Sequence, residues 1–440
     1  MKLKKYCIKK NKMKNIIKIC LLVFCSFVIG KSEANTLTKS LQSAYLNNLK
    51  LNAERANMQA AKEDKRGAVS EFLPSVTISG YVSQQDNTGG EADTNFEPSE
   101  QSLKIEQKIF QSGGGIANFM KKKHGQTLGE FNLKKIEQET LLDAAKAHTG
   151  LLLNRKKVNI NLTNVDLLER QVENDQNRLE KGEIALTDLS QSESSLAGAR
   201  AKLISAQNDL ITSKANFEKI IGKKPSENID EINETNLVLP TSLANAYEIS
   251  KLENPDLQIA TLKFEQAKMD VIIAGSDLSP SATISYEIAE QDDFSATIKD
   301  RTQQTVKAKA TWPLFSGGSN IFGLRKTQQL RNQKELLLED SKKQTQTNVA
   351  NSWSIYQSSM SLLDSIRSQV KAAEIANEGI TLEYETGGTK RTTLEVIQSR
   401  SILLEARISL AKAERDFLIS QFNLLSSVGR LTAKHLNLKQ

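Results

Sequence analysis

Cysteine is scarce in this 440-residue chain, and all three of its cysteines lie close to the start. They are Cys7, Cys20 and Cys25. The rest of the chain therefore has no thiol, and it can form neither a disulfide nor a thiolate metal site. Its stability must come from buried side chains and from assembly.

Long apolar runs are also lacking outside the first 34 residues. Those residues combine a lysine-rich start, an apolar stretch at 16–29 and a small-x-small site at 32–34, which together indicate a signal peptide cleaved before Asn35. The apolar stretch is shorter than the ~20 residues of a spanning helix. An N-terminal membrane anchor stays open as the alternative. If the exported protein meets a membrane, we expect it to do so with strands.

The chain has little net charge once the signal peptide is set aside. The formal net charge of +7 by itself favours a nucleic-acid or membrane-surface partner. Residues 1–34, however, contain nine lysines and one glutamate, so they carry +8 and leave −1 on the remainder. No nucleic-acid partner is therefore expected.

The motifs of catalysis are missing as well. The sequence contains no HExxH zinc motif, phosphate-binding loop, CxxC pair or nucleophile elbow. Its three histidines, His124, His148 and His435, are far apart and are interpreted as surface residues. We expect no enzyme activity, no cofactor and no metal site. An exported enzyme of the outer membrane, one alternative function, has no candidate site.

What the chain does contain is an internal repeat with an offset of about 206 residues. PSVTIS begins at Pro74, and PSATIS begins at Pro280. Each half therefore predicts the same order: a helix, a pair of strands, a Gly-rich turn, and two long helices joined by a second Gly turn. The same offset aligns further positions: Leu37 with Leu243, Asn48 with Asn254, and Leu51 with Leu257.

Apolar residues recur at every seventh position in the long helical segments. Such a strict repeat is typical of helices that supercoil against neighbours. A helix from about 118 to 181 would be on the order of 95 Å long, far longer than a compact domain needs. The series are Ala144, Leu151, Val158, Val165, Val172 and Leu179; Leu189, Leu196, Leu203, Leu210 and Phe217; and Val396, Leu403, Leu410, Phe417 and Leu424.

The strand segments alternate apolar and polar residues. Val76, Ile78 and Val82 lie on one face of the first strand, with Thr77 and Ser79 on the other. This pattern suits a barrel wall with lipid on one side and water on the other, and a soluble hairpin lying on the helices is the alternative. Because four strands cannot close a barrel and an open edge is not tolerated in lipid, copies of the chain must close it.

The organisation expected from these patterns has five parts. They are a signal peptide at 1–34; a first repeat at 35–221, with strands at about 75–84 and 101–110 and a hairpin turning near 182; an equatorial linker at 222–241; a second repeat at 242–430, with strands at about 281–290 and 304–312 and a turn near 388; and a short tail at 431–440. Residues 84–99 and 290–303 are expected to be exposed loops.

Over essentially its whole mature length the sequence resembles the TolC family of outer membrane efflux and secretion channels. The resemblance rests on the duplicated order of FLP at 72–74, WPLFSGG at 312–318, and the segments 182–200 and 388–407. It implies a mainly α fold with a small β part. Three two-repeat protomers of long coiled-coil helices would form an α-barrel across the periplasm, and their four strands each would form a twelve-stranded transmembrane β-barrel.

The resemblance also implies a function and partners. The expected function is an outer membrane channel-tunnel that conducts substrates outward from the periplasm or from an inner-membrane transporter, in efflux or type I secretion. The expected partners are two further copies of the chain, a periplasmic adaptor, an inner-membrane transporter of the RND, ABC or MFS class, and outer membrane lipid. Drug, protein and metal cargo all fit these features.

The two inter-helix turns carry the residues to which the resemblance assigns roles. The family narrows its pore there with a ring of acidic side chains, and the matching positions are Glu395 and Gln398. Threefold symmetry would raise the pKa of three clustered Glu395 carboxyls and attract cations. Gln398 is not acidic, which weakens the expected cation blockade. The turns are placed at Gly182, Gly387 and Gly388.

A closed-state latch is expected beside these turns. In related channels a tyrosine and an arginine bond to an aspartate of the neighbouring helix pair. The candidates are Tyr384, Arg391 or Lys390, and Asp188. Two alternatives stay open: Asp188 can instead stabilise the first turn of its own helix through the dipole, and the two basic residues can be a solvated face.

A soluble periplasmic coiled-coil protein, either structural or an adaptor, is the competing function. It would share the heptads and lie in the soluble periplasm. Adaptors usually interrupt their coiled coil with lipoyl-like and barrel modules, and the sequence shows no such interruption.

Overall fold

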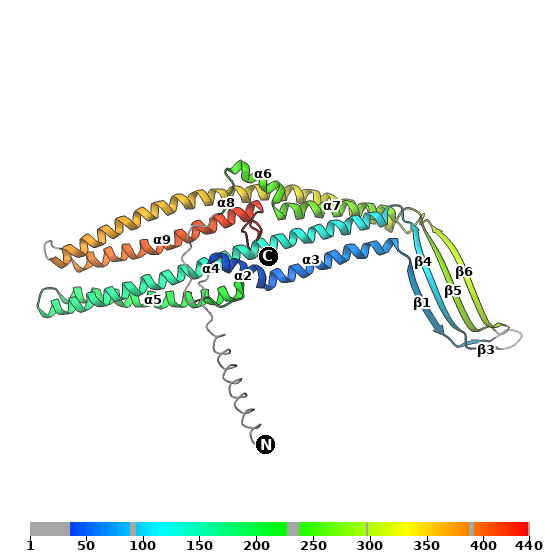
Figure 1. Ribbon diagram of the computed structural model, residues 1–440, viewed down its shortest axis with the longest axis horizontal. Helices are drawn as coiled ribbons and strands as arrows, with labels where there is room; N and C mark the ends of the chain where they lie inside the picture. Colours follow the sequence, from blue (N-terminus) through cyan, green and yellow to red (C-terminus); the bar gives the residue numbers. More distant parts are fainter. Residues whose placement is uncertain (1–35, 89–93, 227–236, 296–297, 387–390, 439–440) are drawn as a thin grey trace, which may run out of the picture.

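The protein is elongated, with a bent sheet at one end of a bundle of long helices (Figure 1). The computed structural model describes residues 36–88, 94–226, 237–295, 298–386 and 391–438. The signal peptide expected at 1–34 lies outside these residues, as do residues 227–236 of the expected linker.

The two halves of the chain contain the same elements in the same order, apart from a 3₁₀ turn and a small hairpin that are described only in the first half. The first half comprises α2 (Leu37–Asn47), α3 (Leu49–Ala68), the 3₁₀ turn η1 (Val69–Phe72), β1 (Ser75–Val82), β2 (Gln85–Asn87), β3 (Thr94–Phe96), β4 (Ser99–Phe110), α4 (Gly114–Glu180) and α5 (Leu186–Ile221). The second comprises α6 (Leu243–Glu253), α7 (Pro255–Ser276), β5 (Ser281–Ser295), β6 (Ile298–Thr311), α8 (Ser319–Thr386) and α9 (Thr393–Val428).

Each half begins with two helices where the sequence predicted one. The break falls at Asn48 in the first half and at Asn254 in the second, the two positions that the repeat aligns. Each asparagine side chain accepts a hydrogen bond from a backbone N–H of the following helix, at 3.2 Å from Leu51 and 3.1 Å from Leu257. Asparagine is a favoured N-cap because its oxygen satisfies a backbone donor that the helix leaves free.

Two long helical hairpins, α4–α5 and α8–α9, form most of the body. At 67 and 68 residues, α4 and α8 are each about 100 Å long. The helices pack side by side in the order α3, α4, α7 and α8, while α5 and α9 return along α4 and α8. None of the described helices has an apolar stretch long enough to cross a membrane.

The heptad residues form an apolar seam inside each hairpin. One seam packs Val165 of α4 against Leu196 of α5, and the other packs Val370 of α8 against Leu403 of α9. Because each seam joins a helix to the one that follows it in sequence, each hairpin is held together by its own burial.

The four longer strands form one antiparallel sheet in the order β1-β4-β5-β6. The register places Val76, Ile105, Tyr286 and Val306 directly opposite one another in a row across all four strands. Side chains in such a row point to the same face of a sheet. The alternation predicted from the sequence therefore gives a continuous apolar face, and β1 and β6 are its two unpaired edges.

The segments expected as exposed loops are more ordered than predicted. Residues 85–87 and 94–96 pair as the short hairpin β2–β3, and β5 and β6 continue their pairing through Asp292 and Asp300. The prediction was wrong because it took polar composition as a sign of a loop. Two paired strands can continue through polar residues where both faces of the sheet are exposed, because the pairing is made by the backbone.

The main core lies at mid-length, where α2, α4, α5 and α9 meet. Phe217 and Phe422 are buried there, together with Leu431 and Leu438 of the C-terminal segment. That segment was expected to be a short tail at 431–440. Over its described residues it folds onto the core, and the carboxylate of Glu137 accepts a 2.6 Å hydrogen bond from the backbone N–H of Ala433.

His148 also belongs to this core, so its interpretation as a surface residue was wrong. It has no exposed surface. Its Nδ1 lies 2.9 Å from the Ser40 hydroxyl, and its ring tilts against Phe217 at 6.2 Å between ring centroids. Its Nε2 has no hydrogen-bond partner among the described residues. Burial lowers its pKa to about 4 because the charged imidazolium would lose its hydration.

We expect His148 to make the fold acid-labile. Its pKa is lower in the folded chain than in the unfolded chain, so its contribution is intact above about pH 6.5 and is lost as the pH falls toward 4. The loss amounts to about 3 kcal/mol per chain. Thermal unfolding of detergent-purified protein at pH 7 and pH 4.5 measures it. His148→Gln stays neutral and should lose clearly less stability between these pH values than the wild type, and an equal loss in both proteins contradicts the assignment.

Candidate functional site at the hairpin turns

The two hairpins end beside each other at the end of the molecule remote from the sheet (Figure 1). The α4–α5 turn contains Gly182, whose φ of 73° is left-handed and favours glycine. In the α8–α9 turn, residues 387–390 lie outside the described part of the chain. The predictions for Gly387, Gly388 and Lys390 fall on those residues.

A buried carboxylate joins the two hairpins near these turns. Asp175 of α4 has no exposed surface. Its Oδ1 accepts hydrogen bonds from Gln171 Nε2 at 2.9 Å and from the Tyr384 hydroxyl at 3.1 Å, and its Oδ2 accepts one from the Ser192 hydroxyl at 2.5 Å. A buried charge is tolerated only when it is well hydrogen-bonded. Asp175 therefore ties α4 to α5 and, through Tyr384, to α8.

The proton positions in this cluster follow from the donors and acceptors available. A carboxylate only accepts, so the hydroxyl proton of Tyr384 goes to Asp175. The Thr393 hydroxyl, 3.0 Å from the same tyrosine oxygen, must then be the donor in its own bond with Tyr384, which brings α9 into the cluster. Burial raises the pKa of Tyr384 above its ordinary value, so the donor stays protonated at neutral pH. The Arg178 guanidinium covers the tyrosine ring at 4.8 Å.

Arg391 and Glu395 lie on the exposed side of the same turn. Glu395 and Thr392 form a capping box, in which the Thr392 backbone N–H donates to Glu395 Oε2 at 2.8 Å. Arg391 bonds Glu383 at 2.7 Å and Glu395 at 3.2 Å, both within its own hairpin. The backbone N–H of Thr392, and after it Arg391, lowers the pKa of Glu395. This lowering of the pKa within one chain is opposite to the rise in pKa that is expected where three Glu395 carboxylates cluster.

The predicted latch residues are only partly brought together. Asp188 accepts a 3.2 Å hydrogen bond from the backbone N–H of Ala185 and so stabilises the first turn of α5, one of the two roles considered for it. Its carboxylate contacts neither Tyr384 nor Arg391 among the described residues. The aspartate that Tyr384 binds is Asp175. Gln398 is exposed one turn beyond Glu395.

Sequence reasoning missed Asp175, although the sequence carries a signal for it. Asp175 lies seven residues after Leu168, which belongs to the buried seam of α4. A carboxylate one heptad along from a buried apolar residue indicates a buried polar contact. Its proximity to Tyr384, 209 residues away, comes from the packing of two hairpins and not from local pattern.

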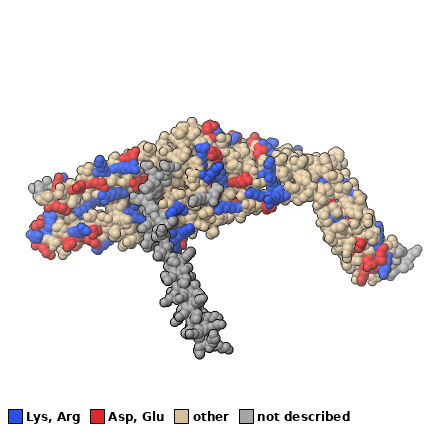
Figure 2. Space-filling model, viewed as in Figure 1, with Lys and Arg blue, Asp and Glu red and all other residues tan. Residues whose placement is uncertain are grey.

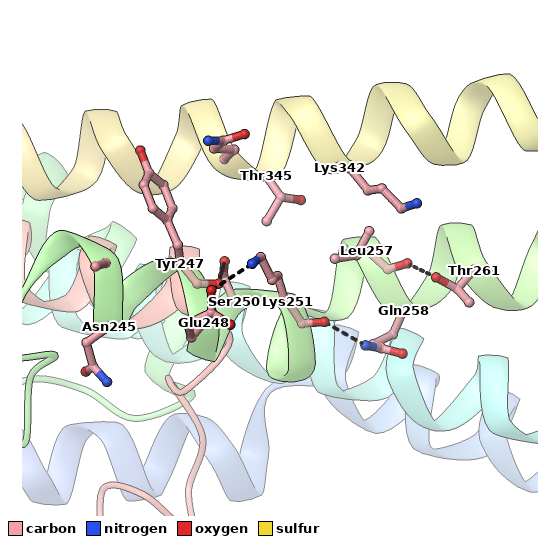
Figure 3. A pocket seen from close by; sticks show the side chains of 12 residues that line it. Asn245, Tyr247, Glu248, Ser250, Lys251, Leu257, Gln258, Thr261, Lys342 and Thr345 are labelled. Atoms are coloured by element: carbon pink, nitrogen blue, oxygen red, sulfur yellow. Dashed lines mark hydrogen bonds and ion pairs between the residues drawn. The ribbon is translucent and has the colours of Figure 1, made fainter.

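A second concave site lies at mid-length, in a cavity of about 900 Å³ between α6, α7 and α8 (Figure 3). Its charged side chains are engaged locally, since Glu248 pairs with Lys251 at 2.7 Å and Lys342 with Glu339 at 2.6 Å. The Thr261 hydroxyl donates to a backbone carbonyl. No cluster of three or more metal-ligating side chains occurs in the part of the chain that the structure describes.

Comparison with known proteins identifies the family. The model of the family described as outer membrane efflux protein matches residues 40–223 and 246–430, and each match holds a strand pair and a helical hairpin. The chain belongs to the outer membrane efflux protein family.

Relatives of this family align with nearly the whole chain. It is 24% identical to the outer membrane efflux protein BepC of Brucella suis, covering 97% of this chain and 92% of BepC. It is 22% identical to the outer membrane protein TolC of Escherichia coli, covering 96% and 88%. The crystal structure of the Campylobacter jejuni CmeC outer membrane channel shares the fold, with a TM-score of 0.80 at 12% identity over 90% of this chain and 86% of that one.

As an outer membrane efflux protein, the chain is a channel protein of the outer membrane whose helical part extends into the periplasm. The predicted fold class, long coiled-coil helices with a small four-stranded sheet, is confirmed. The alternative of a soluble periplasmic structural or adaptor protein is wrong, because the matches are to outer membrane channels along the whole chain.

We predict that Tyr384→Phe loosens the contact between the hairpins, because it deletes the hydroxyl that Asp175 accepts from. A hydrogen bond to a charged group contributes about 1.5–3 kcal/mol. Single-channel conductance of purified protein in a planar bilayer should therefore rise. Asp188→Ala is the matched control, since it removes only the hydrogen bond to the Ala185 backbone N–H in the first turn of α5, and it should leave conductance at the wild-type value. A rise with Asp188→Ala and none with Tyr384→Phe would reverse the assignment of the partner.

Proposed function

We propose that the protein is the outer membrane channel-tunnel of an efflux or type I secretion system, that it works as a homotrimer, and that it opens by an iris-like movement of its hairpin turns. The observation that carries the opening mechanism is the buried Asp175 cluster, in which Tyr384 of the second hairpin closes onto the first. A contact made by a few directional hydrogen bonds between the ends of two hairpins, each of which is closed by its own apolar seam, is suited to two discrete arrangements.

The edges that one chain leaves uncovered support assembly with further copies. The edge strands β1 and β6 have no partner in the described chain, and an open edge in lipid would leave backbone groups unsatisfied. The helical layer also ends on a helix with exposed apolar side chains, since Leu336, Leu362 and Leu382 of α8 are 72%, 54% and 60% exposed. Three copies would pair these edges and close a barrel of twelve strands.

The strands have the surface expected of a membrane wall. Their apolar row, from Val76 across to Val306, would face lipid, and the opposite row, with Thr77, Lys104 and Glu287, would face water. In Figure 2 the part of the sheet nearest the helices shows few charged side chains, and acidic and basic residues gather again at the far end of the strands.

At the turns, we place the pore constriction at Glu395 and Gln398. Arg391 steadies Glu395 from within its own hairpin, so the acidic ring would move with the second hairpin as it opens. Lys390 stays a candidate beside Arg391 for a contact to a neighbouring copy. With only one acidic position per chain, we expect weak blockade by divalent cations.

The working partners would be a periplasmic adaptor and an inner-membrane transporter of the RND, ABC or MFS class, which drive opening and select the cargo. The protein itself would have no catalytic activity and need no cofactor.

Closure of the sheet by three copies can be tested with a lysine on each face. Ile284→Lys puts a charge on the lipid face, at a cost of up to about 2–4 kcal/mol per strand. Ser285→Lys is the matched control on the opposite face, beside Glu106. We expect the first variant to reduce the trimer recovered from outer membranes and the second to leave it unchanged. Equal recovery, or a wild-type protein that is monomeric in mild detergent, would contradict the proposal.

A further inference from the structure

Arg400 of α9 reaches across from the second hairpin to the first. Its Nη1 lies 3.4 Å from the backbone carbonyl of Leu167 and 3.4 Å from Gln171 Oε1, both on α4. The side chain is half-buried, and burial lowers its pKa while the charges of Glu385 and Asp175 oppose that effect. A desolvated guanidinium that spans two helical hairpins is not a solvated surface charge.

Gln171 connects this guanidinium to the carboxylate of the proposed gate. Gln171 is buried, and its Nε2 donates to Asp175 Oδ1 at 2.9 Å. Arg400 can only donate and the Asp175 carboxylate only accepts, so the amide between them has one possible orientation. The three side chains form a relay of fixed polarity from Arg400 through Gln171 to Asp175.

Two other arginines of the hairpins bond within their own hairpin and not across to the other one. Arg407, seven residues further along α9, bonds Glu374 of its own hairpin at 2.9 Å, and Arg200 of α5 bonds Glu169 of its own hairpin at 2.8 Å. Arg200 and Arg407 are equivalent in the internal repeat. The same offset of 207 places Glu193 at the position of Arg400. The cross-hairpin arginine is therefore specific to the second repeat and is not inherited from the duplicated pattern.

We propose that Arg400 is a positioning residue of the gate, which holds Gln171 so that Asp175 stays aligned for Tyr384. The proposal rests on the proposed function, because it assumes that the Asp175 cluster closes the channel. The contact with the Leu167 carbonyl anchors the guanidinium to α4, and the contact with Gln171 transmits its position. Arg400 thus influences the contact between Tyr384 and Asp175 from about two helical turns beyond the start of α9.

Single-channel conductance in planar bilayers tests the relay. Arg400→Gln should raise the frequency of opening by about tenfold, the effect of losing a hydrogen bond to a charged group. Arg407→Gln is the matched control on the same helix and should match the wild type. Arg400→Lys keeps the charge and a donor, and it should recover part of the closure. Gln171→Glu can still accept from Arg400 but cannot donate to Asp175, so it should open the channel with Arg400 in place.

The double variant Tyr384→Phe, Arg400→Gln separates a relay from an independent link. If Arg400 acts through Asp175, the second substitution adds little to the first, because both remove the same contact. Full addition of the two effects would overturn the relay. If Tyr384→Phe opens the channel and Arg400→Gln only lowers the melting temperature, the Arg400 proposal is wrong and the gate stands. If neither opens it, the proposed gate itself is wrong.

Discussion

A carboxylate without contact to water must be hydrogen-bonded on every side, and the organisation of the hairpin ends depends on this constraint at Asp175. Its three donors come from Gln171, Ser192 and Tyr384, which belong to three different helices. Removing any one of these donors leaves the negative charge of Asp175 incompletely hydrogen-bonded in a buried site. The requirement therefore couples the position of α8 to that of α4 and α5.

The contacts within a hairpin and those between hairpins differ in chemistry. Each hairpin is closed by its own apolar seam, such as Val165 against Leu196. Between the hairpins, toward their turns, polar links recur: Tyr384 with Asp175, Arg400 with Gln171, and Lys156 with Glu414 at 3.2 Å. Water can replace polar partners when they separate, whereas separating an apolar seam exposes hydrophobic surface. The two hairpins can therefore move as units, because the polar contacts between them can break while each apolar seam stays intact.

Much of the fold could be predicted from the sequence, because it depends on local periodicity and on duplication. The heptads located the long hairpins, and the alternation located the strands. The repeat aligned Asn48 with Asn254, and both residues cap a helix in the structure. The candidate site was predicted less well. Tyr384 lies in the cluster, but its partner is Asp175 and not Asp188, because the partner depends on the rotation of two helices far apart in sequence. His148 was misplaced for the same reason, since burial at mid-length depends on α2 and α5 packing over α4.

The Asp175 contact, which we propose holds the second hairpin against the first, can be tested by measuring the width at the turns. The chain has no cysteine after Cys25, so a chain that starts at Asn35 with a single cysteine at the exposed Leu394 can carry one spin label without interference. Distances between labels in the assembled protein, measured by pulsed electron paramagnetic resonance, report the width at the turns. We expect a narrow distance distribution for otherwise wild-type protein, and a longer and broader one with Tyr384→Phe. Identical distributions in the two folded proteins would contradict it.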